Sequence, residues 1–260
     1  MPKIILSRKG FDDATGGGPS PIFPDGKMFS IPIPKQEGQN GEDDYKSIIV
    51  KDGLSCDILL KDLFQKKEFR LCHKDPNFEM GVFGQGGAAG KHLENEKVGV
   101  GDIFLFFGSF KRVYQDGEKY CWEPMHPVHV IFGYLQIAEI IKGNECENNE
   151  KCNGHPHTLN KYDNNLIFIG SKKLEKSEIP GFGVFKYSKN LQLTKPGYLK
   201  SYWELPEDLK DVEMTYHDDN SRIEELNLFK SAGRGQEFVI DNEKAYSWAV
   251  DLIKKLKQKP

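Results

Sequence analysis

The chain has 260 residues, a net charge of −3, 38% hydrophobic and 29% charged residues, with 17 Phe, 10 Tyr and 3 Trp. This length and this supply of large apolar side chains exclude the fibrous and disordered classes and predict one large domain or two small ones. Because 36 Lys and Arg face 39 Asp and Glu, no overall positive field exists to hold long nucleic acid nonspecifically. Any contact with nucleic acid must be local.

Cysteine usage and apolar runs predict a cytoplasmic protein. The 5 cysteines, at irregular spacing, do not describe a secreted disulfide framework. The first apolar run, Ile4–Leu6, is shorter than the about 7–15 apolar residues of a signal peptide. The runs 103–107 and 128–132 also fall far short of the about 18 residues of a membrane span. We therefore expect no export signal and no membrane contact.

The N-terminal part is predicted to be mostly extended. Lys3–Leu6 indicates a strand that ends in the polar cluster Ser7–Asp12. Apolar residues alternate with Ser and Pro over Lys27–Pro34, which is typical of an edge strand. A short helix is expected from Ser55 or Asp57, because an apolar stripe at helical spacing follows.

Two apolar strands in the middle of the chain give the clearest architectural signal. A turn and strand over 98–107 precede the long apolar segment His129–Ile140, in which Gly133 predicts a bend or bulge. Asp241–Leu256 predicts a C-terminal helix with Asp241 or Asn242 as its cap. Shorter strands are expected at 166–169, 181–186 and 237–240.

This pair of central strands resembles the small β-barrel of the PUA, ASCH and EVE superfamily. The resemblance rests on Gly101-Asp102 with its apolar strand and on the glycine-containing strand that follows. It implies a barrel core over about 98–142 and a cleft that accepts an RNA element or a single modified base. We predict one α+β domain over residues 1–260, with a PUA-like β-barrel core, an extended N-terminal segment and a C-terminal helix.

Motifs along nearly the whole chain resemble the third family of nucleotide modification associated domains. They are Ser7-Arg8-Lys9-Gly10-Phe11-Asp12, Gly17, Pro19-Ser20-Pro21-Ile22, Pro24-Asp25-Gly26, Ser30-Ile31-Pro32-Ile33-Pro34, Gly101-Asp102-Ile103-Phe104-Leu105-Phe106-Phe107-Gly108, Pro180-Gly181-Phe182-Gly183-Val184-Phe185 and Gly233-Arg234-Gly235-Gln236-Glu237-Phe238. The resemblance implies a setting of DNA or nucleotide modification, or phage defence, with DNA-modification proteins as candidate partners. Association of this kind does not by itself define a reaction.

Two glycine-flanked polar motifs are candidates for nucleotide binding. Arg8 and Lys9 suit a phosphate, with N–H groups of the glycine-rich backbone nearby. The alternative is a strand end with solvated charges, where Asp12 satisfies backbone amides. Arg234 and Gln236 can each make paired hydrogen bonds to a base edge or a phosphate. Their alternative is a buried structural turn in which Arg234 pairs with an acidic neighbour.

A second polar set consists of His73, Asp75, Gln85 and His92. In a cleft, His and Asp could act as acid and base while Gln orients a ligand, although such residues more often cap loops. The run from 83 to 92 contains so much glycine that its backbone is expected to lie close to another part of the molecule.

A cysteine and histidine run offers ligand types that zinc accepts. Cys146, Cys152, His155 and His157 are spaced C-x5-C-x2-H-x-H. That spacing matches no common zinc finger, and the run lies in a polar loop, where free thiols are the alternative. We expect no metal and no other cofactor.

These motifs together predict binding of a nucleotide or a modified base. In this hypothesis Trp122, or another aromatic of the 110–122 connection, stacks on an extruded base. The alternative is an enzyme of nucleotide modification, or a structural subunit of a modification complex. In the binding hypothesis, Ser7, Arg234 and Gln236 read the base edge, and Arg8 or Lys9 beside Asp12 holds the phosphate. Gln85 and His92 complete the predicted ligand-binding set. In the enzyme alternative, His73, Asp75 or His155 stands at the reacting centre.

Overall fold

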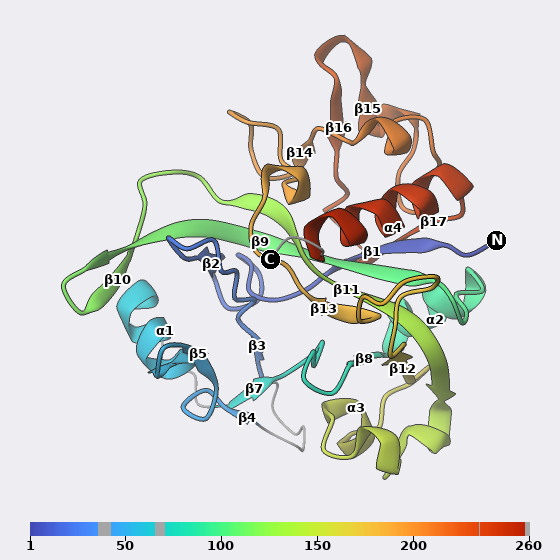
Figure 1. Ribbon diagram of the computed structural model, residues 1–260, viewed down its shortest axis with the longest axis horizontal. Helices are drawn as coiled ribbons and strands as arrows, with labels where there is room; N and C mark the ends of the chain where they lie inside the picture. The colour runs from blue at the N-terminus through green and yellow to red at the C-terminus, as the bar shows by residue number, and fades with distance from the viewer. Residues whose placement is uncertain (36–42, 66–70, 234, 258–260) are drawn as a thin grey trace.

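One sheet organises the fold, which we describe from a computed structural model covering residues 1–35, 43–65, 71–233 and 235–257 (Figure 1). β1 runs parallel to β9, whereas the other neighbours along the main path are antiparallel. This path is β17 (Glu237–Ile240), β1 (Ile4–Arg8), β9 (Ile103–Asp116), β11 (Val128–Lys142), β12 (Leu166–Gly170) and β8 (Val82–Gln85), and β2 (Ser20–Ile22), β10 (Lys119–Trp122) and β13 (Phe182–Val184) pair with β9 or β11.

Helices and small sheets surround this large sheet. The helices are α1 (Cys56–Phe64), α2 (Gly87–Asn95), α3 (Pro156–Leu159) and α4 (Glu243–Lys257), and the small sheets are β14 (Tyr202–Trp203) with β16 (Leu228–Lys230) and β15 (Arg222–Ile223), β3 (Ile33–Pro34) with β7 (Leu71–His73) and β4 (Asp43–Asp44), and β5 (Ile49–Lys51) with β6 (Leu54–Ser55). Figure 1 shows α4, in red, lying beside β1 and β9. Within the described ranges, no helix has both the length and the apolar character that a membrane span requires.

The large sheet curls around an aromatic core. Phe83 on β8 packs against Phe104 and Phe106 on β9, with ring centroids 4.9 and 5.1 Å apart, although β11 and β12 separate these strands in the sheet. The edge strands β8 and β17 approach each other through Gln85 and Glu237, and no backbone ladder joins them among the described residues. The α+β class is confirmed, but the expected PUA-like barrel is not: the sheet curls without being closed by a ladder.

The two central strands are confirmed as β9 and β11. They pair antiparallel, and the register shifts between Ile131 and Gly133, where the sequence predicts a bulge. A Cβ at Gly133 would lie 2.5 Å from the ring of Phe78, so the missing side chain at this bulge lets the ring pack closely. The segment 98–142 therefore supplies β9, β10 and β11 to the large sheet, in which β9 lies between β1 and β11.

The predicted C-terminal helix is confirmed as α4, while the predicted edge strand is much shorter than expected. Asn242 caps α4 by accepting hydrogen bonds from the backbone N–H groups of Lys244 and Ala245, at 3.0 and 3.2 Å. Of Lys27–Pro34, only Ile33–Pro34 pairs as a named strand, β3. Pro32 and Pro34 have no N–H to donate to a ladder, which limits strand pairing in this segment.

A buried histidine on β11 makes the stability of this fold sensitive to acid. The indole N–H of Trp203 donates to Nδ1 of His129 at 3.0 Å, so this nitrogen must remain unprotonated. Burial lowers the pKa of His129 to about 3, and the positive charges of Arg8 and Lys200 act in the same direction. An unfolded histidine has a pKa of about 6.5, so between these values the unfolded chain binds a proton that the folded chain does not.

We therefore expect His129→Asn to reduce the loss of stability in acid. Asn keeps an acceptor for Trp203 but cannot titrate. Below about pH 6.5 the unfolding free energy of the variant should therefore fall less steeply with decreasing pH than that of the wild type, by up to about 1.4 kcal/mol per pH unit. Denaturant unfolding at a series of pH values from about 7 to about 4 measures this slope. The exposed His126 provides the control, and His126→Asn should keep the wild-type slope. Equal slopes for wild type and His129→Asn would contradict the lowered pKa of His129 in the folded protein.

Candidate functional site

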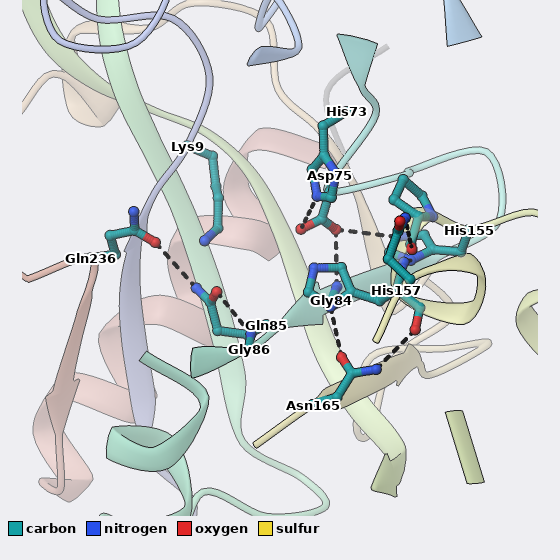
Figure 2. A network of polar contacts seen from close by, with 12 residues as sticks. Lys9, His73, Asp75, Gly84, Gln85, Gly86, His155, His157, Asn165 and Gln236 are labelled. Atoms are coloured by element: carbon teal, nitrogen blue, oxygen red, sulfur yellow. Dashed lines mark hydrogen bonds and ion pairs between the residues drawn. The ribbon is translucent and has the colours of Figure 1, made fainter. Parts of the chain in front are cut away.

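A small pocket opens where the ends of β1 and β8 approach the start of β17. Figure 2 shows the polar contacts among Lys9, Gln85, Gln236 and the histidine cluster beside it. Its volume of about 130 Å³ is below the roughly 300–1,000 Å³ of sites that enclose a drug-sized ligand, so it suits a single base-sized or phosphate-sized group. The pocket is lined by Arg8, Lys9, Gly10, Asp12, Thr15, Ile33, His73, Asp75, Gln85, His157 and Gln236.

Arg8 forms the basic side of this pocket. Its guanidinium donates to the main-chain oxygens of Ala232 and Gly233, at 2.6 and 3.4 Å. It forms no ion pair within the described residues, and its Nε is buried without a hydrogen-bond partner. Burial lowers the pKa of Arg8 while the nearby Asp12 acts to raise it. Because an arginine side chain is not deprotonated in proteins, the guanidinium keeps its positive charge.

A buried ion pair with two amides forms the second side. Lys9 Nζ lies 2.8 Å from Glu237 Oε1, and the side chains are 9% and 1% exposed. Gln85 donates to the same carboxylate oxygen at 2.6 Å and to Gln236 Oε1 at 3.4 Å. The second oxygen of Glu237 is buried and has no hydrogen-bond partner among the residues that the structure describes. Lys9 thus has a carboxylate in direct contact, whereas Arg8 has none among the described residues and only the nearby charge of Asp12 acts on it.

The third side is a cluster of histidines around Asp75. Asp75 Oδ1 accepts from the backbone N–H of Gly84 at 2.9 Å and from His155 Nε2 at 3.2 Å, while Oδ2 lies 4.0 Å from His73 Nε2. Burial alone would raise the pKa of Asp75, but the His155 hydrogen bond and the neighbouring histidines hold it at about 2. Burial lowers the pKa of His73 and lowers that of His157 to about 4. Asp75 is therefore an ionised carboxylate at neutral pH.

Hydrogen bonds fix the protonated nitrogen of two of these rings. His155 Nδ1 accepts from the backbone N–H of His157 at the start of α3, so its proton lies on Nε2 and faces Asp75. The Asn165 amide donates to the carbonyl of His157 at 2.9 Å, which turns Asn165 Oδ1 toward His157 Nδ1 at 2.8 Å. The proton of His157 consequently lies on Nδ1, and its Nε2 has a free lone pair.

A glycine on β8 makes room for the His157 ring, as the glycine-rich run predicted. A Cβ at Gly84 would come within 2.3 Å of ring atoms of His157. The ring is held from another side by Tyr162, which stacks on it with centroids 4.4 Å apart. Close approach of the β8 backbone therefore positions the histidine cluster.

The structure brings together most of the residues that the sequence analysis proposed. Arg8, Lys9, Asp12, His73, Asp75, Gln85 and Gln236 all line the pocket, together with His157. Asp12 also accepts hydrogen bonds from the N–H groups of Ala14 and Thr15, which is the structural role given as its alternative. His155 lies behind Asp75, fully buried.

Other proposed residues lie elsewhere. Ser7 is fully buried within β1 and does not line the pocket, so reading a base edge from there is not supported. Trp122 packs against Phe64 and donates to the carbonyl of Leu63, so it is a core residue of the α1 region and not a stacking platform for this pocket. Arg234 lies outside the described residues.

The cysteines of the C-x5-C-x2-H-x-H run do not join its histidines in a ligand set within the described ranges. Cys146 and Cys152 are buried in an apolar cluster with Ile141 and Ile167. Burial raises the pKa of both thiols, to about 12 for Cys146. The sequence analysis missed that His157 faces His73 and Asp75 instead, and it missed Asn165 altogether. No local spacing signals this contact.

A larger cavity of about 500 Å³ lies next to β17, but its negatively charged lining is unfavourable for a nucleotide. Acidic side chains dominate its lining, and they would repel a phosphate. His92 belongs to this side of the molecule, because its Nε2 lies 3.1 Å from Thr215 Oγ1 in the cavity wall. His92 is thus separate from the small pocket. The acidic residues of the lining are Glu96, Asp211, Glu213, Asp218, Asp219 and Asp241.

Fold and pocket together define an α+β protein whose small polar pocket is built from strand ends far apart in the sequence. The chain belongs to the nucleotide modification associated domain 3 family, whose family model matches residues 3–241. The family predicted from the motifs is confirmed, and its name indicates an association with nucleotide modification. Neither the curated proteins nor the solved structures gave a match.

The close approach at Gly84 gives a test of how the site is built. We expect Gly84→Ala to lower the free energy of unfolding by about 1–3 kcal/mol, because its Cβ would overlap the His157 ring. Gly99→Ala is a matched control, since the nearest atom to its Cβ would lie 3.8 Å away. Denaturant unfolding measures both variants. Equal stability of the two would contradict the packing described for His157.

Proposed function

We propose that the protein binds a nucleotide through the small pocket, in the nucleotide-modification setting that its family name indicates. The observation that carries the proposal is the meeting of Arg8 with Gln236 in one cavity, where Gln85 donates to the carboxamide oxygen of Gln236 at 3.4 Å. A guanidinium suits phosphate, and carboxamides suit the edge of a base. The pocket volume of about 130 Å³ admits one such group, so the rest of the nucleotide would remain outside.

Charge compensation assigns the phosphate to Arg8 and not to Lys9. Lys9 is already paired with Glu237 in a buried contact, and a second anion there would compete with that carboxylate. Arg8 bonds only to main-chain oxygens and to no carboxylate among the residues described. A phosphate would supply an anion in direct contact with the guanidinium and could accept from its fork of N–H groups.

The histidine cluster in the same pocket favours one alternative, an enzyme of nucleotide modification. His73 and Asp75 lie within 4.0 Å of each other and line the cavity in which the nucleotide would bind. Turnover of a nucleotide or an oligonucleotide by the purified protein separates this alternative from binding alone. A structural subunit of a modification complex, in contrast, would bind no nucleotide in isolation.

Nucleotide binding is tested by titrating nucleoside monophosphates and short oligonucleotides, with modified and unmodified bases, into the purified protein. Gln236→Ala should weaken the preferred base by about 1–3 kcal/mol, or roughly tenfold to a hundredfold. Arg8→Gln should weaken all nucleotides alike and lower the salt dependence, with a slope reduced by about one. Arg112, which stacks on Tyr187 away from the pocket, provides the matched control Arg112→Gln.

We expect Arg112→Gln to bind as the wild type does, and thermal unfolding should show that each variant is folded. Absence of binding by the wild type to every nucleotide and oligonucleotide tested would overturn the proposal and favour the structural subunit. Unchanged affinity in both pocket variants would show that any nucleotide binds elsewhere.

A further inference from the structure

We propose that His73, Asp75 and His157 form a binding site for a divalent transition-metal ion in the wall of the small pocket. One ligand atom from each side chain lies within 4.8 Å of the other two. Across the described ranges, this is the single group of three or more His, Cys, Asp or Glu side chains that meets such a distance. β7, the turn that follows it and α3 supply the three residues, so the set is brought together by the tertiary fold.

Hydrogen bonds leave lone pairs available on two of the three proposed ligands, His157 and Asp75. The Asn165 contact places the proton of His157 on Nδ1, which leaves Nε2 free to bind a metal. Asp75 Oδ1 is occupied by two donors, from Gly84 and His155, which leaves Oδ2 on the side of His73. Metal-binding imidazoles and carboxylates are usually oriented by hydrogen bonds of this kind from behind.

Charge also favours a cation here. Asp75 has a side chain only 6% exposed, and a buried carboxylate is costly without a compensating positive charge. His155 accepts a hydrogen bond at Nδ1 and therefore contributes a neutral imidazole. Lys9, a cationic side chain of the pocket lining, is paired with Glu237. A divalent ion would supply the missing charge.

The donor set selects the class of ion. Two imidazole nitrogens and one carboxylate suit zinc, iron, cobalt or nickel, whereas magnesium and calcium prefer oxygen ligands throughout. A set of three protein ligands leaves coordination positions open, as in catalytic and not structural sites. Since all three residues line the pocket, the open positions would face it. The ion would then lie beside whatever group the pocket binds.

This site replaces the expectation of no metal, which considered only the C-x5-C-x2-H-x-H run. Of that run, His157 alone is a ligand here, and His155 orients Asp75 from behind. The thiols of Cys146 and Cys152 remain in their apolar cluster. The proposal does not depend on nucleotide binding, because the metal is measured directly.

The test uses the full chain, stripped with a chelator and dialysed against Zn²⁺ or Co²⁺. We expect about one bound ion per wild-type chain by elemental analysis, and a Co²⁺ absorption spectrum typical of nitrogen and oxygen ligands. His73→Ala and His157→Gln should each reduce the metal affinity at least a hundredfold. Asn165→Ala, which frees the His157 ring without removing a ligand, should reduce it by about 10–100-fold.

Two controls separate this site from other histidines and from the thiols. His92→Ala and the double variant Cys146→Ser, Cys152→Ser should bind metal as the wild type does, and circular dichroism in chelator should show that every variant is folded. The proposal fails if the wild type takes up neither Zn²⁺ nor Co²⁺, or if His73→Ala and His157→Gln retain wild-type affinity. It also fails if binding is lost only in the cysteine variant.

Discussion

The buried contact of Lys9 with Glu237, shared by Gln85, is the interaction on which the rest of the site depends. It joins the segment after β1 to the start of β17 and the end of β8, three places far apart in the sequence. A buried ion pair is not in itself a source of large stability, because both charges lose their water. Its role here is geometric. It draws the two edges of a curled sheet together through side chains, and the pocket lies at that junction.

The order of strands in the sheet explains why β1 and β17, which lie near the two ends of the matched residues 3–241, meet in one place. β1 pairs parallel with β9 on one side and antiparallel with β17 on the other, so that Ser7 lies opposite Glu237. The antiparallel pairing places the end of β1 beside the start of β17, and the backbone N–H of Arg8 donates to the carbonyl of Gln236. The polar motifs after β1 and before β17 are therefore brought together by backbone pairing and need no special surface charge. This agrees with the nearly equal numbers of basic and acidic residues in the chain.

Local signals in the sequence predicted the elements but only part of the site. The cap at Asn242 and the bulge at Gly133 act within a few residues, so they can be recognised without tertiary structure. Ser7 looked accessible at the end of a predicted strand, but β1 is a central strand whose neighbours bury it completely. The contact of His155 with Asp75 spans 80 residues, and no periodicity or spacing encodes it. What could be predicted was the chemistry of the motifs, and what could not was which motifs pack together.

The central place of β1 in the sheet also affects how the protein is made. During translation β1 is made before both of its partners, because the parallel partner β9 begins at Ile103 and the antiparallel partner β17 at Glu237. Until both have emerged, the apolar strand Ile4–Arg8 has unpaired backbone groups on at least one edge, and exposed edges of this kind promote aggregation. Most of this fold must therefore be synthesised before β1 is paired on both edges, which makes β1 the strand most dependent on protection during folding.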